Sequence, residues 1–262
     1  MLSSRMLQSV TTGEYVADAV NSNGTQFANR ASALSGVSNG KQGLISAWVE
    51  INTNTVHHRY VISSGTSGGA NVGLLFSHQY ASDTFVLNAY NSVNTIVLNV
   101  ENDTVFTDVT NPGIHHHLIS WDLSVAGSFK WYVDDVLATV TETTFSNDDI
   151  NYETASGWNV LNDPGFSGAY APWSGDVFDI WFDPGEYIDL TVEANRRNFI
   201  DASGKPVNPG AKGEAFTGTQ PPMFFHLNDG ETPANNFFNN AGSGGTFTAN
   251  GTLTVAPSSP TD

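Results

Sequence analysis

The stretch HHHLISWDLSVAGSFKWYVDDVLATV, residues 115–140, holds apolar runs of strand length that polar turn residues separate. These runs are residues 115–123, 128–135 and 136–140. Asp134 and Asp135 stand between two of the runs, where a two-residue hairpin turn would place them. The stretch therefore predicts β-strands that are neighbours in one sheet.

The same pattern recurs along most of the chain. Further runs, rich in β-branched and aromatic side chains, are residues 44–51, 59–64, 72–77, 84–90, 95–100, 158–162, 175–183 and 223–228. Residues 247–255 add two runs around Asn250-Gly251, a pair that is typical of a hairpin turn. Short strands with Gly, Asn, Ser and Asp between them indicate an all-β sandwich or barrel.

Two segments carry more specific signals. Residues 175–183 have apolar or aromatic groups on both faces, which is typical of a central strand that is covered on both sides. Residues 190–200 predict the one helix of the chain, which Thr191 would cap and which residues 201–204 would end.

Composition excludes several classes of protein. The chain has 262 residues, of which 26 are acidic and 9 are basic, and its formal net charge is −17. This charge disfavours nucleic acid and anionic lipid as partners. The absence of cysteine excludes disulfides, thiolate metal sites and a cysteine nucleophile. Residues 1–20 have no apolar core of signal-peptide length, and no window has the length of a membrane span, so we expect synthesis in the cytoplasm without membrane insertion.

The central stretch carries a family resemblance. His117 opens a strand that leads to Trp121-Asp122, and the next strand ends in Tyr-Val-Asp-Asp at residues 132–135. This arrangement resembles the signature of laminin-G-like and concanavalin A-like lectin and glucanase domains, although Asp135 stands where glycine is usual. Residues 45–49 and 175–182 also resemble strands of that family.

The resemblance covers roughly residues 25–200. It implies an all-β fold, an antiparallel two-sheet jelly-roll sandwich of the concanavalin A-like type with one short helix near its C-terminal end. Residues 1–24 would then be an N-terminal arm. Residues 201–262 would be a C-terminal extension that packs on the sandwich or on neighbouring subunits.

A narrower resemblance begins at Phe182. It runs through DPGEYIDL, RRNFID, GKPV, FFHL and GSGGTFT to Gly251-Thr252-Leu253. This ordered string resembles the C-terminal half of jelly-roll proteins encoded among the structural genes of tailed bacteriophages. It implies a virion component.

Hydrolysis of glycosides requires two carboxylates that flank the scissile bond. The sequence has no tight Glu-x-Asp-x-Glu run of the kind that the family's hydrolases carry. Asp176 and Asp179 are the nearest candidates, with Asp183 beyond, but a spacing of three places the first two on opposite faces of a regular strand. Glu186 fits a solvated face near the start of the helix.

Metal binding has two candidate regions. His115 and His117 share a face of a strand, but a transition-metal site needs three or four ligands, so the favoured interpretation is a strand-opening His117 with two surface neighbours. Asn162 and Asp163, and the acidic pair at 148–149, offer hard oxygen ligands for Ca²⁺. We take Asn162 and Asp163 as the candidate calcium site, against the alternative that such turns are merely solvated.

Tyr170 and Trp173 lie in the predicted loop FSGAYAPWSG. An exposed loop aromatic can stack on a sugar ring or bury itself in a partner. The alternative is that these rings fold back on the edge of the sandwich. Both alternatives remain open from the sequence.

Three functions follow. The first is a non-enzymatic bacteriophage virion protein, in capsid decoration or in the tail, that contacts other virion proteins as a homo-oligomer. The second is a carbohydrate-binding module for a host surface glycan, with Ca²⁺ as its cofactor if it uses one. The third, glycoside hydrolase, has the least support because the paired carboxylates are missing.

Overall fold

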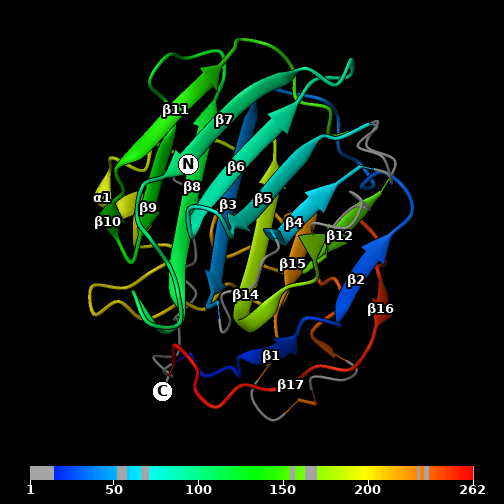
Figure 1. The fold of residues 1–262 in the computed structure, drawn as a ribbon, viewed down its shortest axis with the longest axis vertical. Coiled ribbons are helices and arrows are strands. Elements are labelled where there is room, and N and C mark those ends of the chain that lie inside the picture. The colour runs from blue at the N-terminus through cyan, green and yellow to red at the C-terminus, as the bar shows by residue number, and fades with distance from the viewer. Residues whose placement is uncertain are drawn as a thin grey trace, which may run out of the picture.

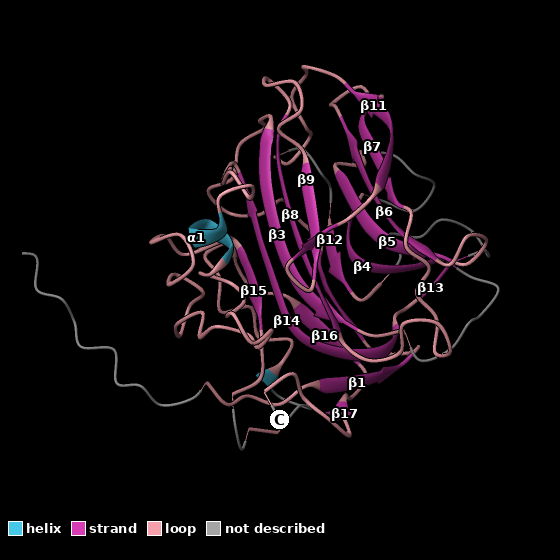
Figure 2. Cartoon of the chain, turned by 90° about the vertical axis from the view of Figure 1, so that its left-hand side faces the viewer, coloured by secondary structure: helices cyan, strands magenta, loops and turns pink. Residues whose placement is uncertain are grey.

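Two antiparallel sheets pack face to face in the computed structural model (Figures 1 and 2). It describes residues 15–51, 58–65, 71–153, 157–162, 170–228, 231–232 and 236–261, without the side chains of residues 170 and 171. Within this part of the chain, no helix is long and apolar enough to cross a membrane. The structure confirms the predicted two-sheet β-sandwich.

The first sheet has eight strands. In spatial order they are β10 (Val136–Leu137), β9 (Lys130–Val133), β8 (His115–Asp122), β3 (Gln42–Val49), β14 (Ser174–Pro184), β1 (Val20–Asn23) and β17 (Thr254–Val255), and β15 (Met223–Phe225) also pairs with β14. All its pairings are antiparallel.

The second sheet has nine strands. In spatial order they are β11 (Val140–Phe145), β7 (Ile96–Asn102), β6 (Thr84–Tyr90), β5 (Leu74–Gln79), β4 (His58–Ser64), β12 (Trp158–Val160), β2 (Phe27–Arg30) and β16 (Thr248–Asn250), and β13 (Tyr170–Ala171) runs parallel to β4. The predicted strands thus exist, and the sequence did not predict β1, β2, β11 and β13.

The main core lies between the two sheets and is rich in aromatic rings. Trp121 and Trp131 from the first sheet are buried there with Trp158 from the second. In β3, Gly43 pairs with Trp121 of β8, and a Cβ added at Gly43 would lie 2.1 Å from Cζ2 of the indole. The absence of a side chain at this position therefore allows the Trp121 indole to pack directly on the backbone of β3.

The first sheet is also covered on its outer face. Trp181 of β14 and Leu44 of β3 belong to a second apolar cluster on that face. Leu190, Phe199 and Phe216, from the chain that follows β14, complete this cluster. The prediction of a central strand with two apolar faces at residues 175–183 is therefore confirmed.

The turn between β9 and β10 is a two-residue hairpin, as predicted. Asp134 and Asp135 both have positive φ angles, 49° and 65°, which is the pattern of a type I′ turn. Asp135 replaces the usual glycine because its carboxylate binds Arg196 Nε at 2.5 Å and Arg197 Nη2 at 2.6 Å. The guanidinium of Arg196 also lies 4.4 Å from the centre of the Tyr132 ring.

The predicted helix at residues 190–200 is much shorter in the structure. Helix α1 spans only Glu193–Arg196, and its N-cap is Val192, without a side-chain capping bond. The Asp189 carboxylate instead accepts hydrogen bonds from the backbone and the hydroxyl of Thr191. Asp189 therefore forms a local turn that competes with the helix, and the prediction of Thr191 as the cap was wrong.

The Asn250-Gly251 pair does not form the predicted hairpin. β16 pairs with β2 in the second sheet, whereas β17 pairs with β1 in the first. The chain crosses between the sheets at this point, and Leu253 is buried in the core. β1 and β2 are consecutive strands that cross between the sheets in the same way. Since β17 pairs with β1 and β16 pairs with β2, the two crossings lie side by side.

Both chain ends contribute to the sandwich. β1 lies within residues 1–24, the predicted arm, and pairs with the central strand β14. β15, β16 and β17 lie within residues 201–262, the predicted extension, and each joins a sheet. Ser259 and Thr261 donate hydrogen bonds to the carbonyl of Ala17, so the described parts of the two ends also contact each other.

Gly43→Ala should lower the free energy of unfolding by about 1–3 kcal/mol, because the new methyl group collides with the buried Trp121 indole. Gly40→Ala is the matched control, since nothing lies within 4 Å of its Cβ position. Urea unfolding followed by tryptophan fluorescence measures both. Equal stability of Gly43→Ala and wild type would contradict the packing described for β3 and β8.

Asp135→Asn should lower the free energy of unfolding at neutral pH by about 1–2 kcal/mol, because it removes the charge that faces two arginines. Burial raises the pKa of Asp135, but the arginine hydrogen bonds outweigh it and hold the pKa below the usual 3.8. A depressed carboxyl pKa stabilises the folded state above pH 3.8, and this contribution disappears as the pH falls through the folded-state pKa.

The difference in the free energy of unfolding between wild type and Asp135→Asn should accordingly become smaller in strongly acidic buffer. Chemical denaturation at a series of pH values measures it, with the exposed Asp108→Asn as the control. A deficit that stays constant down to the acid limit would show that the charge of Asp135 does not matter.

Candidate ligand-binding cleft

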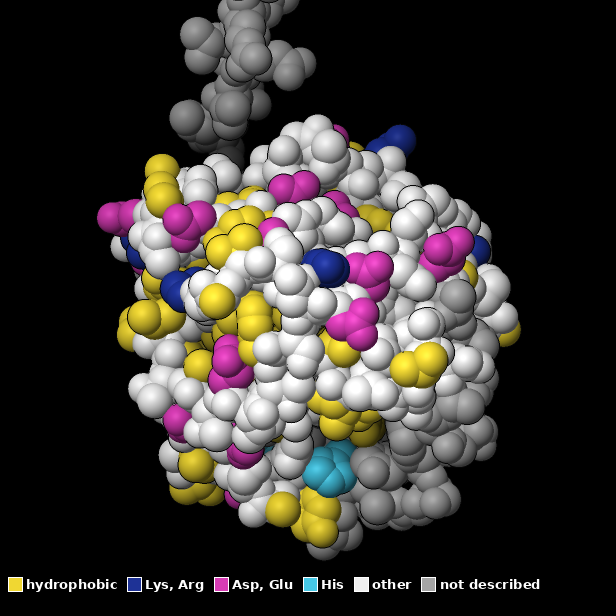
Figure 3. All heavy atoms as spheres, turned by 90° about the horizontal axis from the view of Figure 1, so that it is seen from above, with side chains coloured by type: hydrophobic (Ala, Val, Ile, Leu, Met, Phe, Trp, Pro, Cys, Tyr) yellow, Lys and Arg dark blue, Asp and Glu magenta, His cyan; other side chains and the backbone are white. Residues whose placement is uncertain are grey.

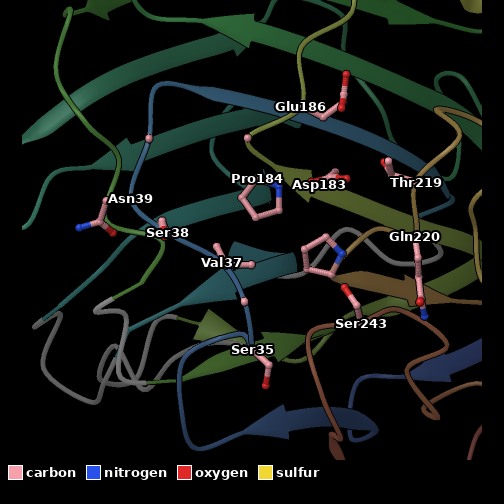
Figure 4. A pocket seen from close by; sticks show the side chains of 14 residues that line it. Ser35, Val37, Ser38, Asn39, Asp183, Pro184, Glu186, Thr219, Gln220 and Ser243 are labelled. Atoms are coloured by element: carbon pink, nitrogen blue, oxygen red, sulfur yellow. The ribbon is translucent and has the colours of Figure 1, made fainter.

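A cleft of about 700 Å³ lies beside the turn that ends β14. Its lining consists of residues 35–40 and 183–186 together with Thr219, Gln220, Pro222 and Ser243. Figure 4 shows residues 35–39 along one wall, Thr219, Gln220 and Ser243 along the other, and Pro184 and Asp183 between them. We refer to this feature as the polar cleft.

The floor of the polar cleft is the turn that ends β14. Pro184 is the last residue of the strand, and Gly185 follows with a φ of 108°, a left-handed conformation that favours glycine. The amide of Gly185 donates to the carbonyl of Gln42, which ties the turn to β3. Asp183 and Glu186 therefore lie on either side of one tight turn.

The walls are held by backbone and side-chain hydrogen bonds to distant parts of the chain. The amide of Ser35 donates to the carbonyl of Gly244 at 2.9 Å. The Asn39 side-chain oxygen accepts from the amide of Glu153 at 2.7 Å, and the Gln220 amide donates to the carbonyl of Ala241 at 2.8 Å. These bonds fix the cleft without engaging its two carboxylates.

The two carboxylates of the polar cleft have no partner among the described residues. Asp183 and Glu186 are each half-buried, and the side chain of neither residue forms a hydrogen bond or an ion pair with a described residue. Burial, and then repulsion by Glu186, raise the pKa of Asp183 to about 7, and burial also raises the pKa of Glu186. Two unpaired acids in one cleft are a feature of functional sites, because they gain stability from a ligand that donates hydrogen bonds.

A second, smaller cavity of about 180 Å³ lies on the outer face of the second sheet. Tyr60 and Leu75 line it with the amides of Gln79 and Asn88. Tyr60 and Leu75 are only 5% exposed, whereas His58 and Tyr90, which also line this cavity, are half-buried. The polar cleft is larger and contains two unpartnered carboxylates, so it is the better candidate site.

The structure places the two predicted aromatic contacts differently. The side chain of Tyr170 lies outside the described residues, and its backbone forms part of β13. Trp173 is 0% exposed and packs in the main core, where its ring lies 6.0 Å from that of Phe85. Of the two alternatives that the sequence left open for Trp173, the structure shows the second: the indole folds back on the sandwich and presents no face to a ligand.

The predicted calcium site is only partly within the described chain. Asn162 is half-buried and its carbonyl accepts from the hydroxyl of Ser63, whereas Asp163 lies outside the described residues. Asp148 of the other acidic loop accepts a hydrogen bond from the Asn91 amide. In the part of the chain that the structure describes, no three acidic or histidine side chains come together to hold a metal ion.

The three consecutive histidines occupy three different environments. His115 Nδ1 lies 2.6 Å from Asp134, and His116 Nε2 lies 2.8 Å from the hydroxyl of Ser46. His117 is fully buried and accepts from the Trp131 indole, and burial lowers its pKa to about 3. His117 is thus a core residue inside β8, which begins at His115, so the interpretation of His117 as the residue that opens the strand was wrong. His116 is buried as well and is not a surface neighbour.

Asp176 and Asp179 do not lie on opposite faces of β14 as predicted. A register shift between Val177 and Ile180 inserts a bulge, so Phe178 and Asp179 both point away from the main core. Asp176 shares that face because it bonds with the Asn21 side chain of β1. Both aspartates are nevertheless buried, at 2% and 3% exposure, so neither is open to a substrate.

Sequence reasoning missed the polar cleft itself. Asp183 was considered only beside Asp176, and Glu186 was assigned to a solvated face. The available signal was the Asp-Pro-Gly-Glu sequence at 183–186, since a Pro-Gly turn brings the residues on either side of it close together. The opposite walls come from residues 35–40 and 219–243, which no local pattern connects to this turn.

No protein-family model matches the sequence, and no curated protein sequence matches it. Many solved structures are similar in fold. A candidate carbohydrate-binding protein from Bacteroides ovatus superposes with a TM-score of 0.59 at 10% identity, over 92% of this chain and 60% of its own. The chain thus spans about three-fifths of the length of that protein.

Two further structures have lower scores. A heptameric pentraxin from Limulus polyphemus has a TM-score of 0.49 at 11% identity, over 91% of this chain and 94% of its own. Domains LG4-5 of the mouse laminin α1 chain have a TM-score of 0.44 at 11% identity, over 67% of this chain and 44% of theirs. The predicted fold class, an antiparallel two-sheet sandwich, is confirmed by the two sheets of this structure and by the superposition on the Bacteroides ovatus protein. The virion resemblance stays a prediction.

Asp183→Asn should change how stability depends on pH. Because the folded-state pKa of Asp183 is raised from 3.8 to about 7, ionisation penalises the folded protein. Wild type should lose stability relative to Asp183→Asn as the pH rises from about 3.8 towards 7, and the difference should stay constant above that window.

Urea unfolding of both proteins across this pH range measures the difference. Glu186→Gln provides the internal test. Removal of the neighbouring charge should lower the pKa of Asp183 and so narrow the pH range over which the folded protein loses stability. Parallel pH profiles for wild type and Asp183→Asn would mean that Asp183 titrates normally.

Proposed function

We propose that this protein is a non-catalytic carbohydrate-binding module and that the polar cleft holds the sugar. The observation that carries the proposal is the pair of unpartnered, half-buried carboxylates, Asp183 and Glu186, in a cleft of about 700 Å³. Sugar hydroxyls donate hydrogen bonds to carboxylates and would satisfy both groups. The Bacteroides ovatus neighbour, described as carbohydrate-binding, supports this ligand class.

The rest of the lining suits a neutral polyol. Ser38, Thr219 and Ser243 bring hydroxyl groups, and Asn39 brings an amide. Hydroxyl and amide groups both donate and accept hydrogen bonds, as do the hydroxyl groups of a sugar. Val37 and Pro222 add apolar surface for the C–H faces of a ring.

The electrostatics disfavour an anionic ligand. The net charge is −17, and Figure 3 shows more acidic than basic side chains spread over one face of the molecule. The described lining contains no Lys or Arg that would attract an anion, and each carboxylate in its ionised form would repel phosphate, sulfate or an acidic sugar. The proposed ligand is therefore a neutral oligosaccharide.

Binding is favoured over hydrolysis by the direction of the two acids. Glycosidases place two carboxyl groups across the scissile bond, about 5–10 Å apart. In Figure 4 the Asp183 carboxylate points towards Thr219, whereas the Glu186 carboxylate lies above Asp183 and points away from it. The two groups do not face each other across one bond, so we propose that they hold the sugar rather than cleave it.

A glycan array probed with the labelled protein, followed by calorimetry on the strongest neutral hit, tests this function. The double variant Asp183→Asn, Glu186→Gln should bind at least about tenfold more weakly, because it replaces two charge-assisted hydrogen bonds with neutral ones. Asp108→Asn, on an exposed loop outside the cleft, is the matched control and should bind like wild type.

The same hit, incubated with the protein and examined by mass spectrometry, should be recovered intact. Binding of no glycan, or equal binding by wild type and the double variant, would contradict the assignment of the polar cleft. Cleavage of the oligosaccharide by wild type but not by the double variant would show that the carboxylates are catalytic.

A further inference from the structure

A second cleft lies around His226. It shares no lining residue with the polar cleft, although Asn240 of its wall bonds to Pro222 and Ala241 bonds to Gln220 of the polar cleft. Two adjoining cavities, of about 400 and 240 Å³, share Ala211, His226 and Asn228. The first is completed by Tyr15 and the loop from Asn208, and the second by Glu231, Asn236, Asn239 and Asn240. We refer to the two cavities together as the His226 cleft.

His226 is the least satisfied polar group of this cleft. The imidazole stacks on Phe224, with ring centroids 4.3 Å apart and planes 13° from parallel. Only 9% of the residue is exposed, and its Nδ1 atom is buried with no hydrogen-bond partner in the described chain. A buried polar atom without a partner is costly, so a ligand that bonds to Nδ1 would stabilise the protein.

The charge state of His226 limits the ligand. Burial lowers the pKa of His226, and the nearby Glu231 carboxylate opposes this shift only in part. The imidazole is therefore neutral at neutral pH, and its Nδ1 can donate or accept according to the tautomer. A neutral imidazole does not attract an anion, and the Glu231 carboxylate repels one.

The neighbouring amides are available as well. The side chains of Asn228 and Asn236 form no hydrogen bond within the described part of the chain. Asn240, by contrast, is fully used: its amide donates to Pro222 and Gly245, and its oxygen accepts from Phe224. Asn240 therefore fixes the wall of the cleft, while Asn228 and Asn236 present free donor–acceptor pairs.

From these groups we infer that the His226 cleft is a second sugar site that takes one neutral monosaccharide unit. A free side-chain amide can donate a hydrogen bond to one sugar hydroxyl group and accept one from the next. The unpaired imidazole nitrogen can form a hydrogen bond with a third hydroxyl group, and the Glu231 carboxylate can accept one from a fourth. The two cavities, of about 400 and 240 Å³, together have the size of a small-molecule site. A metal ion does not fit, because the described residues contain no group of three His, Asp or Glu ligands.

This inference extends the proposed function, because it assigns the same ligand class to a second site with its own residues. Two sites on one chain would hold two units of a glycan, and the second binding event would be intramolecular. Avidity for multivalent glycans would then exceed the affinity of either site.

Protein-observed NMR of the histidine side chains, with glucose, galactose, mannose and N-acetylglucosamine as probes, tests the inference. At least one of these sugars should shift the His226 imidazole signals in wild type. Asn228→Ala should weaken that binding by about fivefold or more, through loss of one free amide. His226→Phe keeps a ring stacked on Phe224 and removes the imidazole, so its spectrum should lack the shifted signal and thereby assign that signal to His226.

Asn147→Ala removes an exposed asparagine that accepts from Lys41 and lines neither cleft, and it should leave the His226 shift unchanged. Asp183→Asn should also leave it unchanged, which separates this site from the polar cleft. A His226 signal that none of the four sugars moves, or a shift that has the same dependence on sugar concentration in Asn228→Ala as in wild type, would overturn the second site. A shift at His226 without any binding at the polar cleft would sink the proposed function there and leave this inference standing.

Discussion

The burial of the first sheet on both faces is the constraint on which the rest of this structure depends. β14 contributes Val177, Ile180 and Phe182 to the core between the sheets, and Trp181 to the cluster on the outer face. A strand that is apolar on both faces must be covered twice. The second sheet covers one face, and the chain from Leu190 to Phe216 covers the other.

This double cover also accounts for the clefts. The chain leaves β14 through Pro184 and Gly185 to reach the outer face, and the turn leaves Asp183 and Glu186 at its two sides. It returns as β15, whose last residues lead to His226 and Asn228. Both polar sites thus lie where segments that cover the first sheet enter or leave it. The ion pairs of Asp135 with Arg196 and Arg197 hold one of these segments against the sheet.

Alternation and turn residues were sufficient to predict most strands, because these features depend on neighbouring residues. The Asp134-Asp135 turn and the two-faced strand at 175–183 are examples. The bulge after Val177 was not predictable, since it arises from pairing with β3 and not from the local pattern. The short helix and the crossing at Asn250-Gly251 were missed for a similar reason: Asp189 and the buried Leu253 impose a path that propensity does not show. The polar cleft is built from three segments that lie far apart in the sequence, so the only part of it that the sequence could predict was the Pro-Gly turn.

The central claim is that the unpartnered carboxylates of the polar cleft bind a neutral sugar. A crystal structure of the protein soaked with its strongest glycan tests this claim most directly. We predict a sugar ring in the polar cleft, with hydroxyl groups within hydrogen-bonding distance of Asp183 and Glu186. A sugar bound only elsewhere, for example on the outer face of the second sheet beside Gln79 and Asn88, with both carboxylates still unpartnered, would contradict the account.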